Sequence, residues 1–317
     1  MEKITNFSFE GKVVVFSNGN SIIQCNASGV WSNCTDSLLF HGCLQEEADA
    51  KIPLHVRHLV MNNYKFITVK SSDTDVVVLL TSFMPEYISH HARIQVDFNF
   101  GKNQKFFNIN TIARGIGFNK CFALRFFYAL SGCDFNSFVL SLSERKLLAL
   151  WLEKFPELTF VFSELSCMPE SVTDSSVDAI EQYWVAAYDS QEKFGSCGLD
   201  DLRFLLFNSS AINDLRRLPP TRNSLRQHIK RAAFIAGWYW GGCLQKGCVV
   251  PSPLSWGWEK NGSKMDPTWI TVPAKSYSTL FTVCACKKKC LNCKCRKQKL
   301  RCLPFCKCMQ KCHNPEG

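Results

Sequence analysis

The feature that most restricts the fold of this chain is a run of nine cysteines between Cys284 and Cys312. They follow the pattern C-x-C-x3-C-x2-C-x-C-x6-C-x3-C-x-C-x3-C, and Lys or Arg fills most of the gaps. Spacings this short cannot enclose a hydrophobic core. The fold of this segment therefore has to come from bound metal, as in small domains that are unfolded without zinc.

The number of thiolates predicts the number of metal ions. Three tetrahedral zinc ions need twelve zinc–sulfur bonds, and nine thiolates supply twelve when six are terminal and three each bridge two ions. One four-cysteine site would leave five thiolates unused, and two such sites would leave one. We therefore expect three zinc ions, held by Cys284, Cys286, Cys290, Cys293, Cys295, Cys302, Cys306, Cys308 and Cys312.

The cysteine segment is also strongly basic. Residues 284–314 contain ten Lys or Arg and no Asp or Glu, whereas the chain before them is nearly neutral. This surplus of positive charge predicts an anionic partner such as nucleic acid. The alternative is that the cations only lower the pKa values of the thiolates and neutralise the cluster. The candidate phosphate-binding residues are Lys287, Lys288, Lys289, Arg296 and Lys297.

The rest of the chain has the composition of a globular protein. Of the 317 residues 46% are hydrophobic, which is enough for a sizeable core and a small appendage. The sequence contains neither an apolar run of about 20 residues, which a membrane helix needs, nor the apolar stretch of a secretory signal. We expect an intracellular protein without a membrane partner, whose 18 cysteines serve as thiols or metal ligands rather than disulfides.

Apolar periodicity predicts both strands and helices in this body. A hairpin is expected over 11–25 and a strand over 66–69, which ends at the acidic turn 71–75. Ser141 and Glu144 have the spacing of a capping box. Helices are expected over 45–63, 143–155, 176–188, 199–207 and 221–240.

Three groups of acidic residues flank these elements: Glu46-Glu47-Ala48-Asp49, Asp73-Thr74-Asp75 and the isolated Asp134. Acids that follow a strand of a parallel sheet collect at its carboxyl edge, the usual place for a site in α/β folds. Paired carboxylates there would suit a hard divalent cation, and two such ions about 4 Å apart carry out phosphodiester chemistry. The alternative is that these acids are solvated loop residues.

The cysteine pattern resembles the CXC domain of the tesmin family, a nuclear DNA-binding module. The acidic groups resemble the second half of a PIN-like nuclease core of the flap-endonuclease type. The chain is also similar to transposon-associated animal proteins that join such a core to a C-terminal CXC unit. That similarity rests on the acidic motifs and on Leu130-Ser131-Gly132-Cys133-Asp134, Pro219-Pro220-Thr221, Lys230-Arg231-Ala232-Ala233 and Trp256-Gly257-Trp258-Glu259.

The resemblance implies roles for particular residues. Magnesium or manganese would be held by Glu47, Asp49, Asp73, Asp75 and Asp134. Three features depart from these families: no matching Asp precedes Glu47, no glycine-rich hairpin follows Asp134, and Leu291-Asn292 replaces a groove-binding Tyr. The first two departures indicate a degenerate nuclease core, and the third argues against sequence-specific reading of DNA by the CXC unit.

We therefore expect an α/β protein with a partial PIN-like core, a parallel sheet with flanking helices, and a small zinc-stabilised cluster. The expected segments are a core over 1–160, a helical extension over 161–245, a Pro/Trp-rich linker over 246–283 and the CXC cluster over 284–314. The expected function is zinc-dependent DNA binding in the nucleus by a transposon-derived protein. The alternatives are an active magnesium- or manganese-dependent nuclease, or a protein-interaction module with structural zinc.

Overall fold

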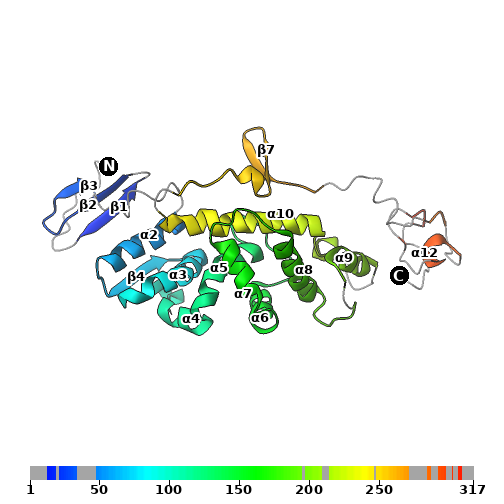
Figure 1. The fold of residues 1–317 in the computed structure, drawn as a ribbon, viewed down its shortest axis with the longest axis horizontal. Helices are drawn as coiled ribbons and strands as arrows, with labels where there is room; N and C mark the ends of the chain where they lie inside the picture. Colours follow the sequence, from blue (N-terminus) through cyan, green and yellow to red (C-terminus); the bar gives the residue numbers. More distant parts are fainter. Residues whose placement is uncertain are drawn as a thin grey trace. The chain divides into compact units, whose positions relative to one another are not determined.

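The computed structural model describes residues 13–18, 21–33, 48–194, 197–208, 214–245, 248–270, 284–286, 292–297, 302 and 306–308 (Figure 1). The chain divides into two compact units, and each draws on separated stretches of sequence. The first unit comprises Met1–Ser137, Pro156–Val172 and Lys230–Trp256, and the second comprises Phe138–Phe155, Thr173–Ile229 and Gly257–Gly317. Among the helices of the described ranges, none combines the length and the hydropathy that a membrane span requires. The four consecutive segments expected from the sequence stay a prediction.

A small antiparallel sheet occupies the N-terminal part of the first unit. Strands β1 (Val14–Asn18) and β2 (Ser21–Cys25) pair in register from Val14 opposite Cys25 to Asn18 opposite Ser21. Strand β3 (Trp31–Asn33) adds to β2. The two strands of the predicted hairpin are therefore confirmed.

The second sheet of the first unit has the order β4-β5-β6. Strands β4 (Phe66–Ser71) and β5 (Arg93–Phe98) are parallel and are connected by the helix α3 (Thr74–Tyr87). Strand β6 (Lys105–Asn108) is antiparallel to β5. The sheet is thus mixed rather than parallel as expected, because residues 99–104 are too short a connection for the crossover that parallel strands need.

Helices cover one face of this sheet. They are α2 (Ala48–Met61), α3, α4 (Ile109–Ile116) and α5 (Phe118–Ser131), and α7 (Leu158–Ser166) packs on α5. Alternate residues of the strands point into the core, where Ile67, Ile94 and Val96 are buried. They pack with apolar residues of α2 and α3 and with Leu244 of the distant segment 241–244. The core of this unit therefore combines residues separated by almost 200 positions.

The second unit is mainly helical. Its helices are α6 (Glu144–Lys154), α8 (Asp174–Tyr188), α9 (Leu199–Asn208) and the first part of α10 (Arg222–Ala233). A π-helical segment, Phe234–Trp240, directly follows α10. The predicted helices are confirmed. The capping residue of α6 is Ser143 rather than Ser141, because the Ser143 hydroxyl accepts the Lys146 N–H at 3.2 Å.

A short hairpin lies in the segment that was expected to be an irregular linker. Strand β7 (Trp258–Asn261) pairs with β8 (Lys264–Pro267) through a turn at Gly262, whose φ is +61°. The tryptophans of this region have different surroundings: Trp240 and Trp256 are buried, whereas Trp269 is 72% exposed. In this stretch Trp256 is thus anchored in the protein interior and Trp269 is not.

Candidate metal centres

The described cysteines of the C-terminal segment are buried together. Cys293 precedes the helical turn α12 (Lys294–Lys297), and Cys295 lies within it. Cys295 is completely buried, whereas Lys294 and Lys297 are exposed. The buried set is Cys284, Cys293, Cys295, Cys302, Cys306 and Cys308, with Cys286 partly buried against it. The expected ligands Cys290 and Cys312 lie outside the described residues.

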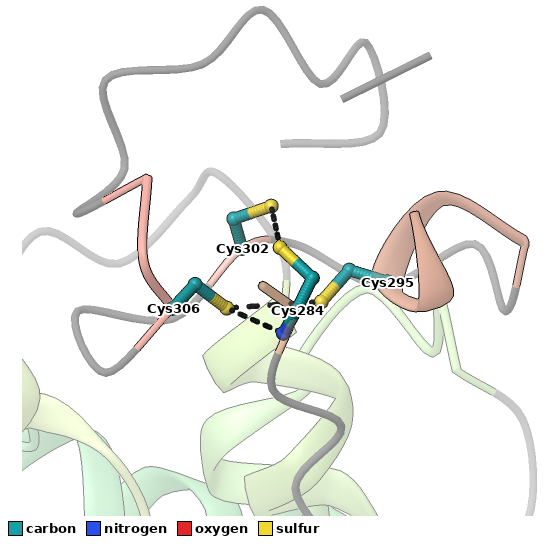
Figure 2. A group of neighbouring side chains, drawn as sticks. All are labelled: Cys284, Cys295, Cys302 and Cys306. Atoms are coloured by element: carbon teal, nitrogen blue, oxygen red, sulfur yellow. Dashed lines mark hydrogen bonds between the residues drawn. The ribbon is translucent and has the colours of Figure 1, made fainter. Parts of the chain in front are cut away.

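Four of these thiols form a compact group that is shown in Figure 2. The Sγ atoms of Cys284, Cys295, Cys302 and Cys306 all lie within 4.8 Å of one another. The Cys284–Cys302 and Cys295–Cys306 sulfur pairs are each 3.8 Å apart, far longer than a disulfide bond. A tetrahedron with zinc–sulfur bonds of about 2.3 Å has edges of about 3.8 Å. The group therefore has the composition and the dimensions of a four-thiolate zinc site.

Cys284 also belongs to a second group of thiols. Its Sγ atom lies within 4.8 Å of those of Cys286 and Cys293. One sulfur shared by two groups of ligands is the arrangement that a bridging thiolate requires. This geometry agrees with the ligand arithmetic of the sequence, although the number of zinc ions stays a prediction.

Burial of the sulfur atoms affects their ionisation. Burial raises the pKa of Cys284 and of Cys295 above the ordinary value, so thiolates would not form there without a positive partner. A bound metal ion reverses that balance and holds coordinating thiols in the ionised state. Backbone N–H groups add to the stabilisation, because those of Cys284 and Arg296 donate to the Sγ atoms of Cys306 and Cys293 at 3.4 Å.

The cationic residues of the segment are only partly described. Arg296 is half-buried and Lys297 is exposed, and both lie on α12 beside the buried sulfur of Cys295. The other candidates for phosphate binding, Lys287, Lys288 and Lys289, lie outside the described residues.

A second candidate centre lies in the first unit, where β4 ends. Asp73 caps α3, because its carboxylate accepts the Asp75 N–H at 2.9 Å, and Asp75 lies in the first turn of this helix. Asp49 lies in the first turn of α2. Carboxylate oxygens of these three residues lie within 4.8 Å of one another, so the fold brings Asp49 to a pair of acids that follows it by 24 and 26 positions.

Asp134 approaches this group through a tight turn at the end of α5. Gly132 ends the helix with φ of +126°, a conformation that other residues rarely adopt. Cys133 and Asn136 then exchange two backbone hydrogen bonds of 3.0 and 3.1 Å. The Asn136 side chain holds the turn against α5 by donating to the Ala129 carbonyl at 2.9 Å. Asp134 is thereby close enough to raise the pKa values of Asp49 and Asp75.

The surroundings of Asp75 show how closely the acids interact. Its pKa is raised to about 6, mainly by burial and in addition by the neighbouring Asp73, Asp134 and Asp49. The Tyr128 hydroxyl donates to Asp75 Oδ1 at 2.7 Å and partly offsets this effect. The pKa of Asp49 is also raised, first by burial and then by Asp73 and Asp134. The raised pKa values of Asp49 and Asp75 have the cause that a bound cation would remove, and the gathered carboxylates of Asp49, Asp73 and Asp75 could hold a metal ion.

None of the protein-family models, curated proteins or solved structures compared with this chain matches it significantly.

The candidate residues from the sequence have different outcomes. Asp49, Asp73, Asp75 and Asp134 come together as described, but their role in metal binding stays a prediction, and Glu47 lies outside the described residues. Sequence reasoning missed Tyr128, whose contact with Asp75 spans 53 positions. No local signal could have found it, because Tyr128 stands in an apolar helix with ordinary helical spacing.

Proposed function

We propose that this chain is a zinc-dependent nucleic-acid-binding protein, nuclear and transposon-derived, with a nuclease-like core that has lost catalysis. The observation that carries the proposal is the group formed by Cys284, Cys295, Cys302 and Cys306, with sulfur separations that match a zinc tetrahedron. Zinc supplies the fold of a segment that has no hydrophobic core of its own. The role in the nucleus and the origin from a transposon come from the resemblance described above.

Nucleic-acid binding is supported by the charge of the same segment. Three thiolate-bound zinc ions on nine cysteines carry a formal charge of minus three, whereas residues 284–314 contain ten Lys or Arg. The surplus cations, including the exposed Lys297, would contact phosphates. Such contacts carry little sequence information, so the expected binding is sensitive to salt and weakly selective.

The direct test compares zinc content and DNA affinity in a matched pair of variants. Cys295→Ser removes a completely buried ligand of the cluster, and Cys121→Ser alters a completely buried thiol in the core of the first unit. We expect Cys295→Ser to lower the zinc content and to weaken duplex binding by tenfold or more, while Cys121→Ser retains both. Unchanged zinc content in Cys295→Ser, measured by atomic emission, would contradict the zinc assignment.

The alternative function, an active nuclease that depends on magnesium or manganese, is favoured by one observation. The carboxylates of Asp49, Asp73 and Asp75 converge within 4.8 Å, with Asp134 beside them. Oxygens in this arrangement suit a hard cation that positions a water molecule for attack on a phosphodiester.

One experiment separates these two functions. Zinc-loaded protein is incubated with labelled flap and duplex DNA in manganese, beside a variant with Asp73→Asn and Asp75→Asn. Asn is chosen because it keeps the cap of α3, which Ala would remove at a cost of about 1 kcal/mol. Cleavage by the parent protein alone would establish the nuclease. A gel shift without cleavage in both proteins would establish a binding protein with a silent core.

A further inference from the structure

The sheet β4-β5-β6 has one face in the core and one face that the described residues leave open. Side chains alternate along each strand, so Ile67, Ile94 and Val96 face the core. The registers place Phe66 opposite Arg93, Thr68 opposite Gln95, and Asp97 opposite both Lys70 and Phe106. These seven residues share the other face, which we call the open face. All but the partly exposed Asp97 are exposed.

Aromatic rings and cations alternate on the open face. Phe66 is 75% exposed, and the Arg93 guanidinium lies over its ring at 5.6 Å from the centroid. Phe106 is 63% exposed. At the edge of the face Lys70 Nζ lies 4.9 Å from the centroid of Phe100, which is also 63% exposed. Single exposed apolar residues are common, but three rings with two stacked cations on one sheet face form a distinct surface.

The charge around the open face is strongly positive. The segments 65–71 and 92–108 contain five Lys or Arg and one acid, Asp97, which already accepts a hydrogen bond from the Gln104 side chain at 2.6 Å. Arg93 also lines a cavity of about 270 Å³ whose walls include His91 and Arg114. Between the rings, the Gln95 amide donates to the Thr68 hydroxyl at 3.1 Å. The centre of the face is therefore polar and its surroundings attract anions.

We propose that the open face binds single-stranded nucleic acid, with bases stacked on Phe66 and Phe106 and phosphates paired with Lys70 and Arg93. Aromatic platforms beside cations suit unpaired bases, because every base has a flat apolar face and a charged backbone. The two rings lie about 16 Å apart, from two strand spacings and four residues along the strands. A strand of several nucleotides spans that distance. Bases of a duplex are already stacked on one another and cannot use the rings.

The positive charge of the open face favours nucleic acid over a second copy of the chain or an apolar peptide. A second copy of the chain would bring the same surplus of cations against this surface, and like charges would oppose the contact. An apolar peptide would leave Arg93 and Lys70 unmatched. Nucleic acid supplies both the stacking surface and the negative charge. The inference concerns the first unit alone and does not depend on the zinc cluster.

The test measures fluorescence anisotropy of a labelled oligothymidine and of a matched duplex with the full chain. The variant with Phe66→Ala and Phe106→Ala removes both platforms. The control with Phe160→Ala and Phe138→Ala removes two rings that are 69% and 74% exposed and lie outside the sheet. We expect the first variant to lose single-strand affinity by tenfold or more with duplex affinity retained, and the control to keep both.

A third protein with Cys295→Ser and Cys306→Ser separates this inference from zinc-dependent binding. It is expected to lose duplex binding while the Phe66 and Phe106 platforms still retain the single strand. Equal single-strand affinity in the platform variant and the control would overturn the inference and leave the zinc proposal intact. Loss of self-association in the platform variant, seen by light scattering without a change in single-strand affinity, would assign the face to a second copy and also overturn it.

Discussion

At the scale of single residues, the ionisation of Asp75 affects both the folding stability of the first unit and its candidate metal site. Its side chain is partly buried, faces three other acids, and accepts a hydrogen bond from Tyr128. A carboxylate in such surroundings is costly when ionised and becomes favourable when a cation is bound. If a divalent ion binds there, as the alternative function requires, it would offset the destabilisation that the ionised carboxylate causes.

Replacement of Asp75 tests this balance through pH. The pKa of Asp75 is about 6 in the folded chain, above its ordinary value of 3.8, so its protonated form stabilises the fold below pH 4. That stabilisation is lost as the pH rises through 6. We expect Asp75→Asn to be more stable than the parent at pH 7.5 by about 1 kcal/mol, after allowance for solvent screening, and similar at pH 3.8.

Urea unfolding at the two pH values measures this difference. Glu153→Gln, which changes an exposed carboxylate on α6, serves as the control and should show little effect at either pH. Manganese should stabilise the parent protein and not Asp75→Asn. If the difference in unfolding free energy between the parent protein and Asp75→Asn is the same at both pH values, the raised pKa is contradicted.

Tyr128 provides a second prediction at this scale. Its hydroxyl donates to Asp75 and favours the ionised carboxylate, so both effects would support binding of a cation by the acidic group. We expect Tyr128→Phe to weaken manganese binding by about tenfold, as for other residues that orient a metal ligand. Calorimetric titration measures the affinity, and unchanged binding would show that Asp75 needs no such support.

At the scale of elements, the turn after α5 depends on one glycine. Gly132 has φ of +126°, where a side chain is strained, and this conformation directs the chain into the turn that carries Asp134. We expect Gly132→Ala to lower the free energy of unfolding by about 1–3 kcal/mol. The same change should weaken manganese binding. Ser131→Ala alters the preceding helical residue and should retain the affinity, and equal losses in both variants would argue against a specific role of the glycine.

The elements also show what the sequence could predict. Helices such as 176–188 were found because their apolar spacing is local, and the strand at 66–69 was found because an acidic turn ends it. The direction of β6 was not predicted, because pairing depends on the length of a connection and on a partner strand. The convergence of Asp49 with Asp75 followed from a resemblance and from strand-end geometry. Neither the resemblance nor the strand-end geometry indicated the contact between Tyr128 and Asp75.

At the scale of the whole molecule, the metal-dependent part and the helical body should respond separately to chelation. The described cysteine segment contains one four-residue helical turn, whereas the helices of both units are built from apolar packing. We expect a strong zinc chelator to abolish duplex binding while the far-ultraviolet circular dichroism changes by less than about a tenth. A large loss of ellipticity would mean that zinc supports the body as well.

The interleaved composition of the first unit has a consequence for its biosynthesis. Cys243 and Leu244 belong to the same core as Val56 and Tyr87, and Arg57 donates to the Leu244 carbonyl. At roughly 5–20 residues per second, a ribosome needs about 5 to 20 seconds to proceed from Ser137 to Leu244. During that time the apolar residues of α2 and α3 lack their packing contacts with Cys243 and Leu244. We therefore expect a nascent chain to expose apolar surface to chaperones before the C-terminal cysteine segment, which begins at Cys284, has been translated.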